Sequence, residues 1–77
     1  MPQEQPIDIE GAECLKAQGN ELYRKLEYSA AHRKYTEAIE LNPKNAVLYA
    51  NRAAVLLALK KWVILVFFIL GPLGALR

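Results

Sequence analysis

The chain has 77 residues and a formal net charge of +2, so it forms one small domain at most and buries a smaller share of its surface than a larger protein does. All eight acidic residues and seven of the ten Lys and Arg residues lie within residues 1–59. This near-neutral balance argues against the dense basic stripe of a nucleic-acid-binding protein. A single cysteine, Cys14, and a single histidine, His32, rule out an internal disulfide and argue against a metal site. We therefore expect no metal and no other cofactor.

The N-terminal segment, residues 1–8, contains Pro2 and Pro6 and offers little for a core to bury. This composition predicts a disordered leader. The segment also lacks the basic and apolar regions of a secretory signal. Together with the lone thiol of Cys14, this favours a reducing, cytoplasmic location.

A first amphipathic helix is expected over residues 9–26, with Asp8 close to the free amides at its start. Its apolar stripe consists of Leu15, Gly19, Leu22, Tyr23 and Leu26, which recur at the spacing of one helical face. Gly19 costs about 1 kcal/mol of helix propensity relative to alanine. We therefore expect a packing reason for Gly19, namely the close approach of a neighbouring helix.

A reversal at residues 27–29, with Ser29 as an N-cap, predicts a second helix over residues 29–41. The residues expected to face inward are Ala31, Tyr35, Ala38 and Ile39. Because Ala31 and Gly19 are both small, the two antiparallel helices can pack with their axes close together. Pro43 ends the second helix because proline disfavours a helical conformation in the residue before it.

The chain then begins to repeat itself with a period of 34 residues. Ala46, Tyr49, Ala53, Leu56 and Leu57 stand 34 residues after Ala12, Leu15, Gly19, Leu22 and Tyr23. This predicts a third helix over residues 46–60, with Ala53 packing as Gly19 does, and a second reversal at residues 60–62. A period of this length, with one helix-turn-helix in each repeat, is typical of a helical solenoid.

Several of these positions together resemble the tetratricopeptide repeat. They are Gly19, Tyr23, Tyr28, Ala31, Tyr35, Ala38 and Pro43 in the first repeat and Ala53 in the second. The segments LKAQGNELY, YTEAIELNP and LYANRAA are similar to the first two repeats of co-chaperones that hold the acidic C-terminal tails of heat-shock chaperones. The resemblance covers about residues 12–62. It implies an all-α, antiparallel helix-turn-helix array of about one and a half repeats, acting as a protein-protein interaction adaptor.

The same resemblance implies a carboxylate-binding site at Lys16, Asn20 and Asn51, the three positions that match the clamp of those co-chaperones. A lysine supplies a charge and asparagines supply donors, which suits a carboxylate. The implied partner is a heat-shock chaperone tail or another acidic peptide. The rest of that clamp belongs to a third repeat, so we expect half a clamp and weak affinity. The alternative is that all three residues are ordinary surface residues.

The sequence shows no nucleophile with a nearby base, and we expect no enzymatic activity.

The tail, residues 63–77, departs from the repeat. Leu65, Ile69 and Pro72 stand where Ala31, Tyr35 and Ala38 stand in the first repeat, and residues 62–76 carry no charge. The tail could form an apolar helix that packs on the earlier helices. It could instead be a membrane anchor, although roughly 15 residues at about 1.5 Å each are shorter than a hydrocarbon core of about 30 Å.

A third interpretation concerns the origin of the tail. The repeat pattern stops abruptly at Trp62, as it would in a truncated product, and a solenoid usually needs about three repeats for independent stability. The sequence favours this origin, which is compatible with an apolar helix that packs. A tail-anchored membrane protein and a non-functional fragment are therefore the alternatives to an adaptor, and a membrane partner is not favoured.

Overall fold

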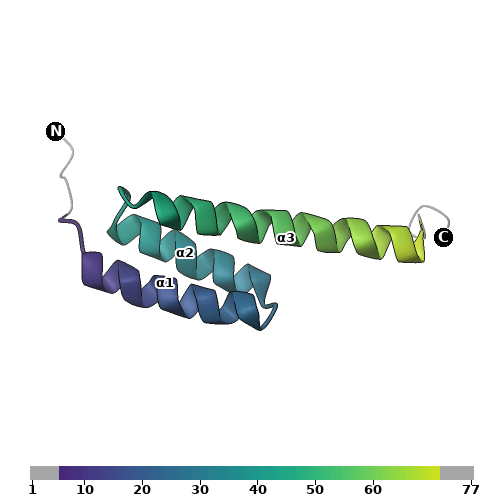
Figure 1. The fold of residues 1–77 in the computed structure, drawn as a ribbon, viewed down its shortest axis with the longest axis horizontal. Coiled ribbons are helices and arrows are strands. Elements are labelled where there is room, and N and C mark those ends of the chain that lie inside the picture. Colours follow the sequence, from purple (N-terminus) through teal and green to yellow (C-terminus); the bar gives the residue numbers. More distant parts are fainter. Residues whose placement is uncertain (1–5, 72–77) are drawn as a thin grey trace.

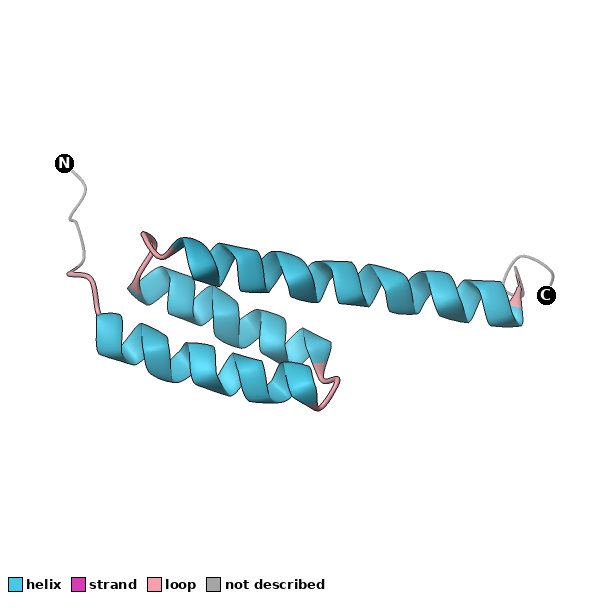
Figure 2. Cartoon of the chain, viewed as in Figure 1, coloured by secondary structure: helices cyan, strands magenta, loops and turns pink. Residues whose placement is uncertain are grey.

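Three helices make up most of the described structure, a computed structural model that covers residues 6–71. They are α1 (Ile9–Arg24), α2 (Tyr28–Leu41) and α3 (Ala46–Leu70). Figure 2 shows only helices and loops among these residues, and the all-α class is confirmed. Of the expected leader only residues 6–8 are described, as a non-helical segment. Residues 1–5, and Pro72 with the rest of the tail to Arg77, lie outside the described residues.

The helices pack in chain order, with α2 between α1 and α3. Figure 1 shows α1 and α2 as an antiparallel hairpin and α3 running along α2 and then well beyond its end. The main-chain N–H of Asp8 donates to the carbonyl of Leu41 at 2.9 Å, which fastens the start of α1 to the end of α2. The Asp8 carboxylate accepts from the N–H of Gly11 at 2.9 Å and caps α1, since the first amides of a helix have no partner within it.

The reversal between α1 and α2 lies at residues 25–27 rather than at residues 27–29. Leu26 takes a left-handed conformation, with φ 67°. The N–H of Leu26 donates to the carbonyl of Tyr23 at 3.0 Å, and the N–H of Glu27 donates to the carbonyl of Leu22 at 2.9 Å. This pair of hydrogen bonds is the pattern of a Schellman motif. Helix α2 consequently begins at Tyr28, with Glu27 rather than Ser29 in the N-cap position.

The core consists of two clusters, and α2 contributes to both. One contains Ala12, Ala38, Ile39 and Leu48; the other contains Ala31, Tyr35 and Val55. Gly19 is buried beside the second cluster, where a Cβ atom on it would lie 2.6 Å from the Tyr35 ring. A side chain at Gly19 would therefore collide with a buried aromatic ring, and the glycine allows α1 and α2 to approach.

Helix α3 contradicts the predicted second reversal. It continues through residues 60–62 without a break and ends at Leu70, before Gly71 with φ 69°. Residues 60–70 contain no glycine or proline to end the helix. Leu65 and Ile69 stand where Ala31 and Tyr35 let α2 pack, so a returning helix would have no close fit. No returning helix within residues 6–71 covers the face that the 34-residue period marks as inward. Ala53 and the large side chains Tyr49, Leu56 and Leu57 are exposed.

The buried side of α3 is instead the side that faces α2. Leu48 and Val55 are fully buried, and Leu59 packs against the second cluster. Arg52 donates to the hydroxyl of Thr36 at 3.3 Å, which adds a polar contact from α3 to α2. The first half of α3 is thus a packed helix with one covered side.

Candidate functional site

Three helices meet at the side-chain amide of Asn20. Its Oδ1 accepts from the hydroxyl of Tyr35 at 2.5 Å and from the Nδ2 of Asn51 at 3.4 Å. Asn20 lies on α1, Tyr35 on α2 and Asn51 on α3. Because the oxygen of Asn20 is engaged by these two donors, its Nδ2 group is the part of the amide that can donate to a ligand.

Tyr35 positions the Asn20 amide from within the core. Its side chain is almost completely buried, and burial raises the pKa of the Tyr35 phenol above its ordinary value. The hydroxyl therefore keeps its proton throughout the neutral pH range and stays a donor to Asn20. This fixes the orientation of the Asn20 amide.

Lys16 lies one helical turn before Asn20 on α1 and is half-buried. Its Nζ forms an ion pair with Glu13 at 3.0 Å. About half of the Glu13 side chain is exposed, and such solvated pairs contribute little net stability. A ligand carboxylate can therefore replace Glu13 as the partner of Lys16 at small cost.

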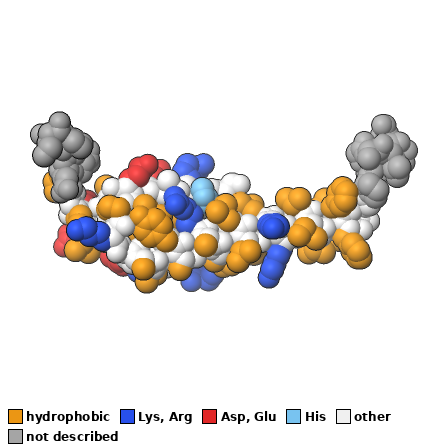
Figure 3. Space-filling view, turned by 90° about the horizontal axis from the view of Figure 1, so that it is seen from above, with side chains coloured by type: hydrophobic (Ala, Val, Ile, Leu, Met, Phe, Trp, Pro, Cys, Tyr) orange, Lys and Arg blue, Asp and Glu red, His pale blue; other side chains and the backbone are white. Residues whose placement is uncertain are grey.

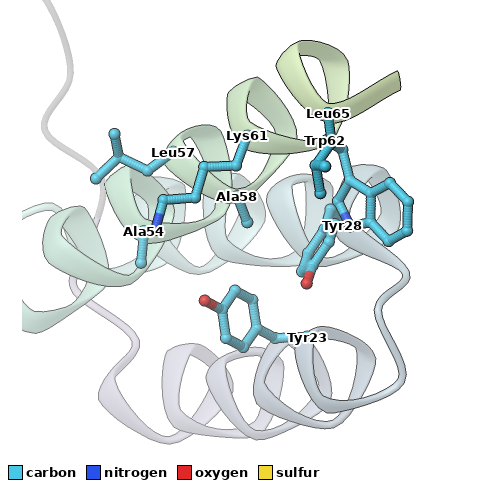
Figure 4. A pocket seen from close by; sticks show the side chains of 8 residues that line it. All are labelled: Tyr23, Tyr28, Ala54, Leu57, Ala58, Lys61, Trp62 and Leu65. Carbon is cyan, nitrogen blue, oxygen red and sulfur yellow. The ribbon is translucent and has the colours of Figure 1, made fainter. Parts of the chain in front are cut away.

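A cleft of about 480 Å³ is lined by side chains from all three helices. Its lining residues are Tyr23, Tyr28, Ala54, Leu57, Ala58, Lys61, Trp62 and Leu65, and Figure 4 shows the Lys61 side chain lying along α3 with its amino group toward Ala54. Tyr23 stands one turn after Asn20, and Ala54 one turn after Asn51. The aromatic cleft and the amide site are therefore neighbours along α1 and α3.

Lys61 is a cleft residue that the sequence prediction missed, because the prediction placed residues 60–62 in a reversal. The signal that could have found it is the absence of any helix-ending residue before Gly71. With the helix continued, Asn51, Ala54 and Lys61 fall at i, i+3 and i+10, on one side of α3.

The residues expected to pack the repeat divide between the covered and the open parts of the molecule. Ala31, Tyr35 and Ala38 are buried on α2, and the Tyr23 and Tyr28 rings contact each other with centroids 5.4 Å apart. Pro43 follows the end of α2, and its carbonyl accepts from the Tyr49 hydroxyl at 2.8 Å. Tyr23, Pro43 and Ala53 are exposed, and Ala53 has no returning helix over it within residues 6–71.

Acidic, histidine and cysteine side chains are scattered over the surface. Within residues 6–71 no three of them gather as metal ligands would. Cys14 is exposed, and its sulfur accepts from the Gln18 amide at 3.5 Å. The polar groups that do converge, on Asn20, are hydrogen-bond donors and acceptors and include no nucleophile with an adjacent base.

Comparison with known proteins identifies the class of protein that this chain resembles. Residues 34–63 match the sequence model of the family described as "Tetratricopeptide repeat". This match runs from the second half of α2 into α3 and contains the core residues Tyr35, Ala38, Leu48 and Val55. No solved structure gives a significant match.

Relatives match over a longer stretch. The chain is 49% identical over 51 residues to DnaJ homolog subfamily C member 7 of Homo sapiens, a match that covers 66% of this chain and 10% of the relative. It is 51% identical over 51 residues to Small glutamine-rich tetratricopeptide repeat-containing protein 2 of Saccharomyces cerevisiae, covering 66% and 15%. It is 45% identical over 56 residues to Stress-induced-phosphoprotein 1 of Caenorhabditis elegans, covering 73% and 18%.

These matches confirm the resemblance to tetratricopeptide-repeat co-chaperones over about two thirds of the chain. The chain therefore carries a tetratricopeptide-repeat segment, and homology of this kind indicates a protein-interaction adaptor. The matched segments span less than a fifth of the relatives' own lengths. Tetratricopeptide-repeat proteins are generally non-enzymatic.

Proposed function

We propose that the chain is a cytoplasmic adaptor that binds the acidic C-terminal peptide of a partner protein at Lys16, Asn20 and Asn51. The observation that carries this proposal is the convergence of two donors, the buried Tyr35 hydroxyl and the Asn51 amide, on the Oδ1 atom of Asn20. It joins side chains from three helices at one point, one turn from a lysine whose present partner is a solvated glutamate.

The chemistry suits a terminal carboxylate. Lys16 offers a point charge, while the Nδ2 groups of Asn20 and Asn51 offer directed hydrogens, and hydrogen bonds to a carboxylate are stronger than those between neutral groups. Asn51 gives one of its two hydrogens to Asn20 and keeps the other for a ligand. The tail of a heat-shock chaperone, ending in a sequence such as Glu-Glu-Val-Asp, is the partner that the resemblance implies.

The affinity should be low. Three side chains from one and a half repeats supply few contacts, and binding must offset the lost freedom of the peptide. A dissociation constant on the order of 0.1 to 1 mM corresponds to about 4 to 5.5 kcal/mol, which two or three charge-assisted hydrogen bonds can supply.

The test is a titration of the whole chain with a peptide ending in Glu-Glu-Val-Asp, followed by NMR or calorimetry, against the same peptide with an amidated C-terminus. We expect saturable binding that needs the free carboxylate. Lys16→Ala should weaken it roughly tenfold, the value of one hydrogen bond to a charged group. Lys25→Ala is the matched control, because Lys25 is an exposed lysine at the far end of the same helix.

Equal binding of the free and amidated peptides would contradict the proposal. So would equal losses in the Lys16 and Lys25 variants, since the contribution would then come from net charge alone. Circular dichroism of each variant establishes that the helices are intact in the titration.

A further inference from the structure

The end of α3 projects from the molecule beyond the cleft that Lys61, Trp62 and Leu65 line. Every residue from 60 to 70 is exposed, and Phe68 is 84% and Ile69 71% exposed. Figure 3 shows hydrophobic side chains gathered over this end of the molecule. Residues 62–70 are apolar without interruption. An exposed apolar surface of this kind is typical of a site that binds a partner or a membrane.

The apolar side chains stand on all sides of the helix. Successive residues of an α-helix point about 100° apart, so nine consecutive apolar residues surround the axis completely. A second copy of the chain, or a peptide, packs against one side of a helix and leaves the opposite side in water. A helix that is apolar all round is buried in a large protein core or in lipid, and since neither a second copy nor a peptide surrounds it, the all-round pattern favours a membrane.

The base of this apolar end carries the residues that suit a membrane surface. Lys60 and Lys61 precede Trp62; lysines attract anionic headgroups, and tryptophan is enriched at the interface between headgroups and acyl chains. Beyond Glu40 the sequence contains no acidic residue at all. Nothing on α3 therefore opposes the approach of a negatively charged surface.

The length of the apolar end fits one leaflet. Residues 63–70 rise about 12 Å, close to half of a hydrocarbon core of about 30 Å. By length and composition the whole of α3, Ala46–Leu70, could cross a membrane. Crossing would strip Leu48 and Val55 from α2 and carry Arg52, Lys60 and Lys61 into hydrocarbon, so partial insertion is the arrangement that keeps the fold intact.

We propose that residues 60–70 dock on an anionic membrane and insert into its nearer leaflet, with Lys60 and Lys61 at the headgroups and Trp62 at the interface. The amide site of Asn20 and Asn51 then faces the aqueous phase. This docking does not depend on the peptide-binding proposal, because Lys16, Asn20 and Asn51 all lie outside residues 60–70.

Trp62 is the only tryptophan of the chain and reports directly on insertion. The whole chain is mixed with vesicles of phosphatidylcholine containing about a third phosphatidylserine, and Trp62 fluorescence is followed. We expect a blue shift on binding. We also expect stronger quenching by lipids brominated near the headgroup than by lipids brominated near the end of the acyl chain.

Four variants test the proposed membrane surface. Phe68→Asp places a charge among the inserted residues and should abolish the shift; Val47→Asp adds the same charge at the opposite end of α3, on an exposed residue, and should leave it unchanged. Replacing Lys60 and Lys61 with glutamine should weaken binding about fivefold for each lysine. Lys16→Ala should leave vesicle binding unchanged, which separates a failure here from a failure of the peptide site.

Three outcomes would overturn the proposal. One is an unchanged Trp62 spectrum with vesicles while circular dichroism shows intact helices. Another is a blue shift that appears without lipid and grows with protein concentration, which would identify a second copy as the occupant. The third is quenching that is strongest from the deepest bromines, which would indicate insertion beyond one leaflet.

Discussion

Gly19 of α1 and Ala53 of α3 stand 34 residues apart and at equivalent points of two similar helices, yet Gly19 is buried and Ala53 is exposed. The difference arises from the next segment of the chain in each case. After α1 the chain reverses and α2 returns with a tyrosine that fills the space over Gly19. After Ala53 the helix continues to Leu70, and no helix returns within residues 6–71. The pattern of a sequence can thus specify a helix while its burial depends on a partner that the chain must also supply.

The first way to test this comparison is to truncate one leucine on each side of α3. Leu48→Ala removes a fully buried side chain and should cost about 2 to 5 kcal/mol of the free energy of unfolding. Leu56→Ala, on the uncovered side, should change it by less than about 0.5 kcal/mol. Urea unfolding followed by circular dichroism measures both. Similar losses would mean that the Leu56 side of α3 is also packed.

A second test enlarges the two equivalent positions. Gly19→Leu forces a side chain into the buried Tyr35 ring and should destabilise the fold by about 1 to 3 kcal/mol. Ala53→Leu, which meets no partner among the described residues, should stay within about 0.5 kcal/mol of the original. Thermal unfolding of both variants is the measurement. Destabilisation by Ala53→Leu would show that α3 has a covering helix in solution.

A third test breaks the link between the hairpin and α3. Tyr35→Phe removes the hydroxyl that donates to Asn20 and should cost about 1 kcal/mol. The pKa of Tyr35 is raised in the folded chain by burial, so the folded form holds its proton more tightly than the unfolded form does. The contribution of the protonated Tyr35 hydroxyl to the free energy of unfolding should be complete below about pH 10. It should be lost as the pH rises further.

The control for this pH dependence is the variant itself. Unfolding free energies of the original chain and of Tyr35→Phe, measured from about pH 8 to about pH 11 on either side of the ordinary tyrosine pKa, should converge as the pH increases. A constant difference across this range would contradict the assigned role of the buried hydroxyl.

The smallest effect concerns the reversal that only the first repeat makes. Leu26→Gly relieves a left-handed conformation that costs a leucine roughly 1 kcal/mol, while the Leu26 side chain is 59% exposed and loses little packing. We expect a gain of about 0.5 to 1 kcal/mol in urea unfolding. Lys25→Gly, one residue earlier and with φ −82°, should give no gain. A loss in Leu26→Gly would mean that the leucine side chain packs in solution.

The sequence predicted the helical segments well where local signals mark their ends. Asp8, Pro43 and the apolar spacing placed the three helix starts within one residue. The second reversal was wrong because it was carried over from the first repeat. Neither turn contains a glycine, and the first turn forms because α2 can pack against α1. Leu65 and Ile69 replace the small and aromatic residues of α2, so an equivalent returning helix has no close fit.

The site shows a similar division. Lys16, Asn20 and Asn51 could be proposed from resemblance, and as a binding site they remain a prediction. The role of Tyr35 under Asn20 depends on the rotation of two helices about each other and has no signature in residue spacing. Lys61 was missed for the same reason as the long helix, because its place in the cleft depends on the continuation of α3.

Because α3 packs against α2 along its first half and is exposed along its second, its backbone amides should exchange with solvent at two different rates. Backbone amides near Leu48 and Val55 can exchange with solvent only when the packed core opens, whereas the turns near Phe68 open by local fraying, which has a much lower free-energy cost. One continuous helix should therefore contain slow and fast hydrogen exchange, with the change of rate near Leu59. Whatever covers its far end will be detected first as a slowing of exchange in those last turns.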